Sequence, residues 1–293
     1  MLHIKSGDVV QFQVREVSSG QLNTNSSVED YLNLITPERR SQLYPLAGPV
    51  FVEGASEGDT LAVDILDMKV ADWGWSGLRP HWPPLTEIDE SWFNIWDLSN
   101  GKYAPFKKGI KIPLRPFPGT IGVAPKEHGK FDISVAYDDR GGNLDIRHLN
   151  KGSRLMLPVL NDGALFSVGD PHAAQGDGEL GTALESPAEI TLRFELEKGE
   201  TIPGVQYFSS KQSRSEEDSS YFATTGSVPD LMEATKLAAR RMIQYLTKEY
   251  DLARSEALVL CGLTADLRIH HVVDPPNWTV GLMIPTRVLE GKI

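Results

Sequence analysis

The sequence predicts a mainly β protein, with a β-sandwich over residues 1–200 and a smaller α+β portion over residues 201–293 that completes the same globule. Apolar and polar residues alternate in 9–14 and again in 60–66, which is the period of a strand with one buried face. Nineteen prolines and 26 glycines divide the chain into short segments, as expected for a β-sandwich with long loops.

Each of these two strands follows a Gly-Asp pair, Gly7-Asp8 or Gly58-Asp59. Glycine adopts positive φ at little cost and Asp caps the turned backbone, so each pair predicts a β-turn whose Asp has a structural role. Gly199-Glu200 is a weaker third example. Further strands are predicted at 131–136, 153–160, 164–168 and 188–196.

The last third of the chain carries the helical signals. Pro229 and Asp230 are typical of a helix N-terminus, and apolar residues then recur at helical spacing as far as Leu246. The other predictions for this third are a short helix at 255–263, strands at 267–273 and 279–285 joined by a turn at 274–277, and a surface loop at 209–220.

Composition and charge exclude several classes of partner. The net charge is −11 with a pI near 5.1, and there is no clustered basic stretch, so neither nucleic acid nor an anionic membrane is an expected partner. The N-terminus has no apolar segment typical of a secretory signal, and no apolar run reaches the length of a membrane span. Because the single cysteine, Cys261, can form no internal disulfide, we expect a cytoplasmic protein.

A dense polar segment, 169–179, follows the predicted strand at 164–168 and reads as a loop. Its polar side chains are Asp170, His172, Gln175, Asp177 and Glu179. Carboxylates and histidine bind divalent metals or move protons, and the three interspersed glycines let the backbone approach a ligand closely. The alternative is a solvated acidic turn, but an Asp-x-His pair directly after an apolar strand favours a functional site.

A second polar cluster lies about 25 residues upstream. Asn143 and Asp145 alternate with apolar residues, so in an extended segment they share one face, and a neighbouring strand could bring them beside His172. The alternative is a β-turn with its usual Asn and Asp. Glu185, at the start of the next strand, is a further candidate ligand or base. His270 is expected at a surface or strand position, and His271 receives no role.

Three motifs carry a family resemblance: Gly-Gly-Asn-Leu-Asp (141–145), Gly-Ser-Arg-Leu-Met-Leu-Pro-Val (152–159) and Gly-Ala-Leu-Phe-Ser-Val-Gly-Asp-Pro-His-Ala-Ala-Gln-Gly-Asp-Gly-Glu (163–179). Together with shorter matches they resemble the acetamidase/formamidase family over nearly the whole chain. The resemblance implies hydrolysis of short linear amides to carboxylate and ammonia, a jelly-roll-like β-sandwich, and a homodimer or higher homo-oligomer. Leu144 stands where the family's motif has Met.

Nucleophilic catalysis by a side chain is disfavoured. Cys261 lies in an apolar run, where a buried structural thiol is expected. The sequence contains no G-x-S-x-G elbow. A G-x-G-x-x-G match at 176–181 precedes a strand rather than the helix that a dinucleotide site requires. Metal-assisted hydrolysis is the mechanism that remains.

We therefore predict a divalent metal, zinc in the first place, with calcium or manganese as alternatives. His172 and Asp145 are the first predicted ligands, and Asp170 or Glu185 completes the set. Either Glu179 or Asp177 would serve as the acid/base. The residues predicted to hold the amide or its oxyanion are Asn143 and Gln175.

Five of the six tryptophans lie between Trp73 and Trp96. Prolines 80, 83 and 84 predict a loop here, and we expect Trp75 and Trp82 to form an aromatic wall over the metal, or else a subunit contact or a satellite core. Two rival functions stay open: a non-catalytic β-sandwich binding module with a structural calcium, and a hydrolase of another C–N bond such as that of a ureide.

Overall fold

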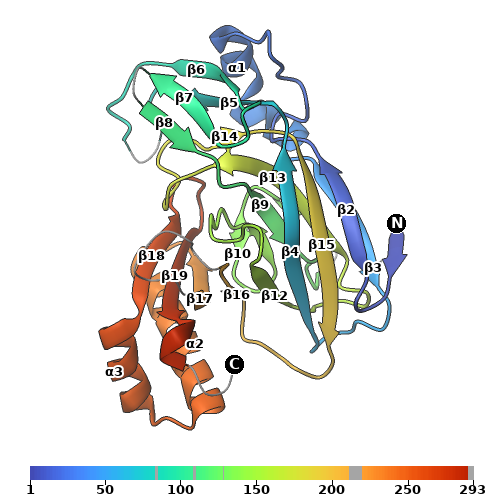
Figure 1. Ribbon diagram of the computed structural model, residues 1–293, viewed down its shortest axis with the longest axis vertical. Coiled ribbons are helices and arrows are strands. Elements are labelled where there is room, and N and C mark those ends of the chain that lie inside the picture. Colours follow the sequence, from blue (N-terminus) through green and yellow to red (C-terminus); the bar gives the residue numbers. More distant parts are fainter. Residues whose placement is uncertain (83–84, 108–109, 128, 211–219, 290–293) are drawn as a thin grey trace.

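The computed structural model describes residues 1–82, 85–107, 110–127, 129–210 and 220–289. Most of the surface loop predicted at 209–220 lies outside the described residues. The predicted fold class is confirmed, because two large sheets make up most of the protein and helices cover only part of it (Figure 1).

The first sheet contains nine strands. Their bounds are β1 Leu2–Ile4, β3 Leu46–Val52, β5 Trp73–Leu78, β6 Trp92–Asp97, β9 Phe117–Gly122, β10 Ala136–Tyr137, β11 Gly141–Asn143, β13 Phe166–Ala174 and β14 Leu184–Glu185. The order is β10-β11-β9-β13-β14-β5-β6, with β3 also paired to β13 and β1 to β3. The long strand β13 thus contacts three neighbours and anchors this sheet.

The second sheet contains eight strands. Their bounds are β2 Val9–Val14, β4 Thr60–Val70, β12 Arg154–Pro158, β15 Ala188–Glu197, β16 Gln206–Phe208, β17 Tyr221–Val228, β18 Asp266–His271 and β19 Trp278–Pro285. The order is β18-β19-β17-β16-β12-β4-β15-β2. Because β16 pairs with β12, strands from both sides of residue 200 form one sheet. A separate hairpin joins β7 Tyr103–Lys107 to β8 Ile110–Pro113.

The apolar core lies between the two sheets, where β4 and β15 run side by side (Figure 1) and contribute with β13 to one buried cluster. Phe166 of β13 meets Phe194 of β15 edge to face, with ring centroids 4.9 Å apart. Phe12 of β2 packs against both rings. Burying each of these rings contributes about 1.5–3 kcal/mol, so this contact fixes how the two sheets stack.

Helices α2 Leu231–Tyr250 and α3 Arg254–Thr264 follow β17, and α2 packs against β17 and β19. The predicted helix begins at Leu231, because Ser227 and Val228 still belong to β17, and Asp230 of the predicted N-terminal signal caps the helix by accepting from the Glu233 N–H at 2.8 Å. The remaining helical elements are α1 Val28–Leu34 and the 3-10 turns Pro37–Gln42 and Thr286–Leu289. In the described part of the chain, every helix is too short or too polar to cross a bilayer.

The tryptophan-rich segment is not the loop that its prolines predicted. Trp73–Leu78 and Trp92–Asp97 form the antiparallel pair β5–β6. Pro80 falls in the connection between these strands, where no ladder hydrogen bond is needed, so it does not interrupt the pairing, whereas Pro83 and Pro84 lie outside the described residues.

Two other strand predictions were wrong in extent. The predicted strand at 131–136 is reduced to a short pairing that begins at Ala136. The segment from Gly169 was expected to be a loop, but β13 continues through it as far as Ala174. Pro171 lies opposite Pro118 of β9 in this strand, and its carbonyl accepts from the Ser186 N–H at 3.2 Å.

Asp59 ties its turn to a segment about 140 residues away. Its carboxylate accepts hydrogen bonds from the Ser56 N–H at 2.8 Å, from Lys198 Nζ at 2.7 Å and from the Gly199 N–H at 2.9 Å. Burial opposes ionisation of Asp59, but these partners hold the pKa of its carboxyl well below its ordinary value. The contacts support the structural role predicted for this residue.

We expect Asp59→Asn to lower the free energy of unfolding by about 1–2 kcal/mol while kcat and KM per folded molecule stay unchanged. A carboxyl with a depressed pKa stabilises the fold only while it is ionised, so the advantage of the wild type should be full at neutral pH and shrink below about pH 4. Asp8→Asn is the matched control, because the exposed side-chain carboxylate of Asp8 accepts from the Lys5 N–H of its own turn, and its loss should cost less. A loss of turnover without a change in melting temperature would contradict this role.

Candidate active site

The predicted site residues of β13 and β14 come together in the interior. Strand pairing puts His172 opposite Glu185, and both side chains are almost fully buried. Asp170, two residues before His172 on β13, is also buried. His172 Nε2 lies 3.1 Å from Glu185 Oε1 and 3.4 Å from Asp170 Oδ1. The sheet register therefore aims one imidazole nitrogen at two carboxylates.

Gln175 fixes the orientation of His172. The Gln175 side-chain amide donates from Nε2 to the backbone carbonyl of Asp145 at 2.8 Å, so its Oε1 faces His172 Nδ1, also at 2.8 Å. Nδ1 must then carry the proton and donate to Gln175. His172 Nε2 is left to bind a cation or a proton between the two carboxylates.

Asp145 approaches the same point from the segment after β11. Its Oδ1 lies 3.9 Å from His172 Nδ1, and its Oδ2 accepts from Asn143 Nδ2 at 2.9 Å. Gly119 of β9 allows this approach, because a Cβ there would stand 2.7 Å from Asp145 Oδ1 and 2.9 Å from Asp170 Oδ2. Asn143 and Asp145 were expected to lie beside His172, and the structure brings them there.

Two residues that sequence reasoning left without a role complete this group. His271 Nε2 lies 3.6 Å from Asp145 Oδ2 and 3.5 Å from Asp274 Oδ2. Glu179 joins them, since one ligand atom from each of these four residues lies within 4.8 Å of the others. His271 and Asp274 are more than 120 residues away in sequence from Asp145, so no local pattern connects them to it.

Burial sets the charge state of these acids. It raises the pKa of Asp145 to about 7 and the pKa of Glu185 to about 8, and it raises the pKa of Glu179 well above its ordinary value. Burial alone would lower the pKa of His172, but the carboxylates of Glu185 and Asp170 raise it well above its ordinary value. The group is therefore short of positive charge.

Several carboxylate oxygens of the group are buried with no hydrogen-bond partner among the described residues. They are Asp145 Oδ1, Asp170 Oδ1, Glu179 Oε2 and Glu185 Oε2. A buried acceptor left unpaired costs about 1–3 kcal/mol, and more when it is charged. In a tetrahedral zinc site neighbouring ligand atoms lie about 3.3 Å apart, which matches the 3.1 and 3.4 Å between His172 Nε2 and its two carboxylates. These residues could hold a divalent cation.

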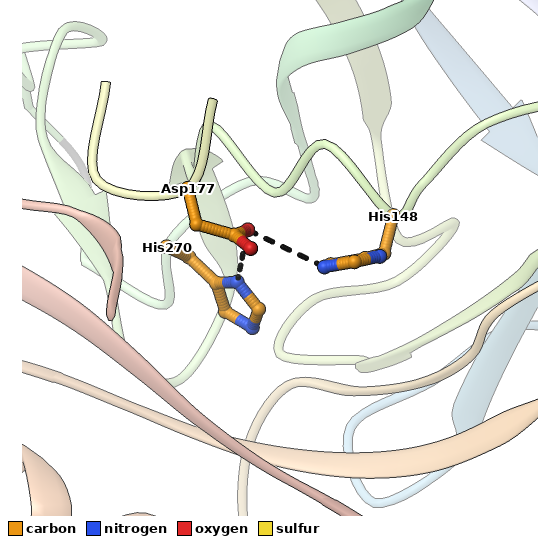
Figure 2. A group of neighbouring side chains, drawn as sticks. All are labelled: His148, Asp177 and His270. Atoms are coloured by element: carbon orange, nitrogen blue, oxygen red, sulfur yellow. Dashed lines mark ion pairs between the residues drawn. The ribbon is translucent and has the colours of Figure 1, made fainter. Parts of the chain in front are cut away.

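A second polar group consists of His148, Asp177 and His270 (Figure 2). Asp177 Oδ1 lies 3.3 Å from His148 Nε2 and 3.8 Å from His270 Nδ1. Arg268 Nη1 donates to the other oxygen, Oδ2, at 3.1 Å. Burial opposes ionisation of Asp177, but contacts with both histidines hold the pKa of its carboxyl below its ordinary value. Neither a role for His148 nor the full burial of His270 was predicted from the sequence.

A cavity of about 500 Å³ opens beside Gln175. Its other lining residues include Arg147 and three aromatic side chains, Trp92, Trp96 and Phe106. Because Gln175 both lines this cavity and bonds to His172, the cavity adjoins the first polar group.

Trp75 and Trp82, the predicted aromatic wall, do not line the cavity beside Gln175. Trp75 packs with Tyr31 and Phe93, and its Nε1 donates to buried Glu16 at 3.0 Å. Trp82 lines a separate cavity of about 120 Å³ beside Leu180.

Comparison with known proteins places the chain in a family. A model of the acetamidase/formamidase family matches residues 1–130 and 133–291. The crystal structure of a predicted acetamidase/formamidase from Thermoanaerobacter tengcongensis aligns with a TM-score of 0.88 and 30% identity, over 99% of this chain and 91% of that chain. The formamidase of Methylophilus methylotrophus is 27% identical over 99% of this chain and 87% of its own length. The acetamidase of Mycolicibacterium smegmatis is 26% identical over 67% of this chain, which spans 63% of that protein. The chain therefore belongs to the acetamidase/formamidase family of amidases.

Proposed function

We propose that this chain hydrolyses short linear amides to a carboxylate and ammonia, with a divalent cation held by His172, Asp170, Glu185 and Asp145. The observation that carries this proposal is the buried imidazole nitrogen aimed at two carboxylates, in a group where four carboxylate oxygens have no hydrogen-bond partner among the described residues. The formamidase and acetamidase named above support the choice of substrate class.

A divalent cation, when bound, polarises an amide carbonyl and lowers the pKa of a coordinated water to about 7. A histidine ligand favours zinc, whereas the excess of carboxylates also suits calcium or manganese. His172 is well suited to binding because Gln175 holds its Nδ1 proton, which leaves Nε2 as the ligand atom.

Glu179 is the better candidate for the acid/base. An amide nitrogen leaves only after it is protonated, so the group that serves it must be able to carry a proton near neutral pH. Burial raises the pKa of Glu179 well above its ordinary value, which favours the protonated form, and its Oε2 has no partner among the described residues. Asp177 is held ionised by its contacts with Arg268 and two histidines, which suits a ligand rather than a proton donor.

We propose positioning roles for Asn143 and Gln175. Asn143 Nδ2 donates to both Asp145 and Asp274, and its Oδ1 accepts from Thr120 at 2.6 Å. Its amide is therefore fully occupied in orienting the acids. Gln175 Nε2 has a second hydrogen and lines the cavity, so it can also contact an amide carbonyl.

The homo-oligomer implied by the resemblance remains a proposal. Helix α3 supports it, because Leu258, Val259 and Leu263 are more than half exposed on its surface. An apolar face of this kind is typical of a subunit contact.

The first expected outcome concerns the cation. The purified protein should carry a divalent ion, and exhaustive chelation should abolish ammonia release from formamide and acetamide until zinc is restored. His172→Ala should lower the metal content of the purified protein, measured by elemental mass spectrometry, while circular dichroism shows an unchanged fold. Full activity in a demonstrably metal-free sample would rule out this mechanism.

The second concerns the proton carrier. Glu179→Gln keeps the side-chain shape but cannot accept a proton, so kcat should fall about 10²-fold or more while the metal stays bound. Glu16→Gln is the matched control, because Glu16 is also a fully buried acid but bonds to Ser18 and Trp75 instead. If Asp177→Asn abolishes turnover and Glu179→Gln does not, the roles of the two acids are reversed.

The third concerns acyl-chain length. Trp92 and Trp96 line the cavity beside Gln175, so Trp92→Ala should raise kcat/KM for butyramide relative to acetamide, by about 10-fold for each methylene accommodated. Trp82→Ala, which alters a separate cavity, should leave the ratio unchanged. A shift with Trp82→Ala alone would put the aromatic wall where the sequence first suggested. Including ureides in the same ammonia assay tests the rival C–N bond.

A further inference from the structure

His148, Asp177 and His270 converge from three separate segments of the chain. His148 follows β11, Asp177 follows β13, and His270 lies on β18 in the second sheet. Figure 2 shows both imidazoles pointing toward one carboxylate oxygen. His148 and His270 are almost completely buried, and Asp177 is about three-quarters buried, with 24% of its side chain exposed.

The distances within this group are too long for hydrogen bonds. Asp177 Oδ1 lies 3.3 Å from His148 Nε2 and 3.8 Å from His270 Nδ1, whereas an N–H···O bond spans about 2.7–3.2 Å. All three atoms lack a hydrogen-bond partner among the described residues. The chain thus brings together three buried ligand atoms that do not satisfy one another.

The same distances suit a shared cation. Tetrahedral ligands of zinc lie about 3.3 Å apart, which matches the 3.3 Å to His148 Nε2 and is shorter than the 3.8 Å to His270 Nδ1, and one ligand atom from each of the three residues lies within 4.8 Å of the others. We propose that His148 Nε2, His270 Nδ1 and Asp177 Oδ1 bind a second divalent cation, separate from the cation at His172. Two imidazole ligands identify this second cation as zinc. This inference goes beyond the proposed function, because it needs neither the substrate nor the first cation.

Surrounding contacts hold the three side chains in ligand geometry. Tyr207 Oη lies 3.1 Å from His270 Nε2, so that nitrogen is engaged and Nδ1 is left for the metal. Arg268 binds Asp177 Oδ2, which leaves Oδ1 as the ligand atom. The Gly178 N–H donates to the His270 carbonyl at 3.1 Å and joins the Asp177 turn to β18. Metal-binding side chains typically have such outer partners. Two imidazoles and one carboxylate favour zinc over calcium.

Each proposed ligand lies close in sequence to a residue of the first group. His148 follows Asp145 by three residues, Asp177 precedes Glu179 by two, and His270 directly precedes His271. A cation on the second group would therefore cross-link the same three segments that carry these acids. The second cation would be a structural element that holds the first group together.

Zinc stoichiometry tests this directly. The full-length protein is loaded with zinc alone, freed of excess by gel filtration, and analysed for bound equivalents. We expect two equivalents for the wild type and for His3→Ala, a surface control, but one for His148→Ala, His270→Ala or His172→Ala. The double variant of His148 and His172 should bind none. Asp177→Asn keeps the side-chain volume and should also bind one equivalent fewer than the wild type. This variant tests the site if an alanine variant fails to fold.

The outcomes separate the two sites. Two equivalents retained in folded His148→Ala, His270→Ala and Asp177→Asn would overturn the second site, as would a single wild-type equivalent that only His172→Ala removes. If the wild type binds a single equivalent that is lost in His148→Ala but kept in His172→Ala, the result would support the second site and contradict the cation in the proposed function. An added readout is thermal: zinc should raise the melting temperature of His172→Ala but not that of the double variant.

Discussion

Several carboxyl groups are buried together around His172, and the cost of ionising them side by side is the constraint on which the rest of the site depends. Withdrawing a single ion from water costs several kcal/mol even after the protein relaxes. Asp145, Asp170, Glu179 and Glu185 bear that cost together with few internal donors. The fold holds them there because each acid is fixed by strand register or by a turn beside a strand, supported by the apolar contact between the two sheets.

The site depends on both sheets at once. Asp170, His172 and Glu185 come from the first sheet, whereas His270 and His271 come from β18 at the edge of the second. The four ligands proposed for the first cation lie on or directly after strands of the first sheet, whereas the group of His148, Asp177 and His270 needs both sheets. Loosening the contact between Phe166 and Phe194 would therefore separate the histidines of β18 from the acids of β13, although these rings belong to the apolar core.

Local sequence was sufficient for part of this arrangement. Asp170 and His172 are two residues apart on one strand, and Asn143 and Asp145 alternate with apolar residues, so spacing alone exposed them as candidates. His271, Asp274, His148 and His270 carried no such signal, because their partners are distant in sequence and meet them only after the sheets pack. The β5–β6 hairpin was missed because the prolines of its connection were read as breaking the strands. The extent of β13 was missed for a similar reason, since Gly169 and Pro171 are typical of a loop, whereas the strand continues through both as far as Ala174.

Three of the acids, Asp145, Asp170 and Glu179, have φ between 49° and 53°, the left-handed region that disfavours side chains larger than glycine. Backbone of this kind costs roughly 1–3 kcal/mol per residue. Glycine would relieve the strain at each position but would remove the carboxylate. Selection for stability alone would thus erode the site one residue at a time, and the persistence of these acids in a lineage would record selection for chemistry rather than for folding.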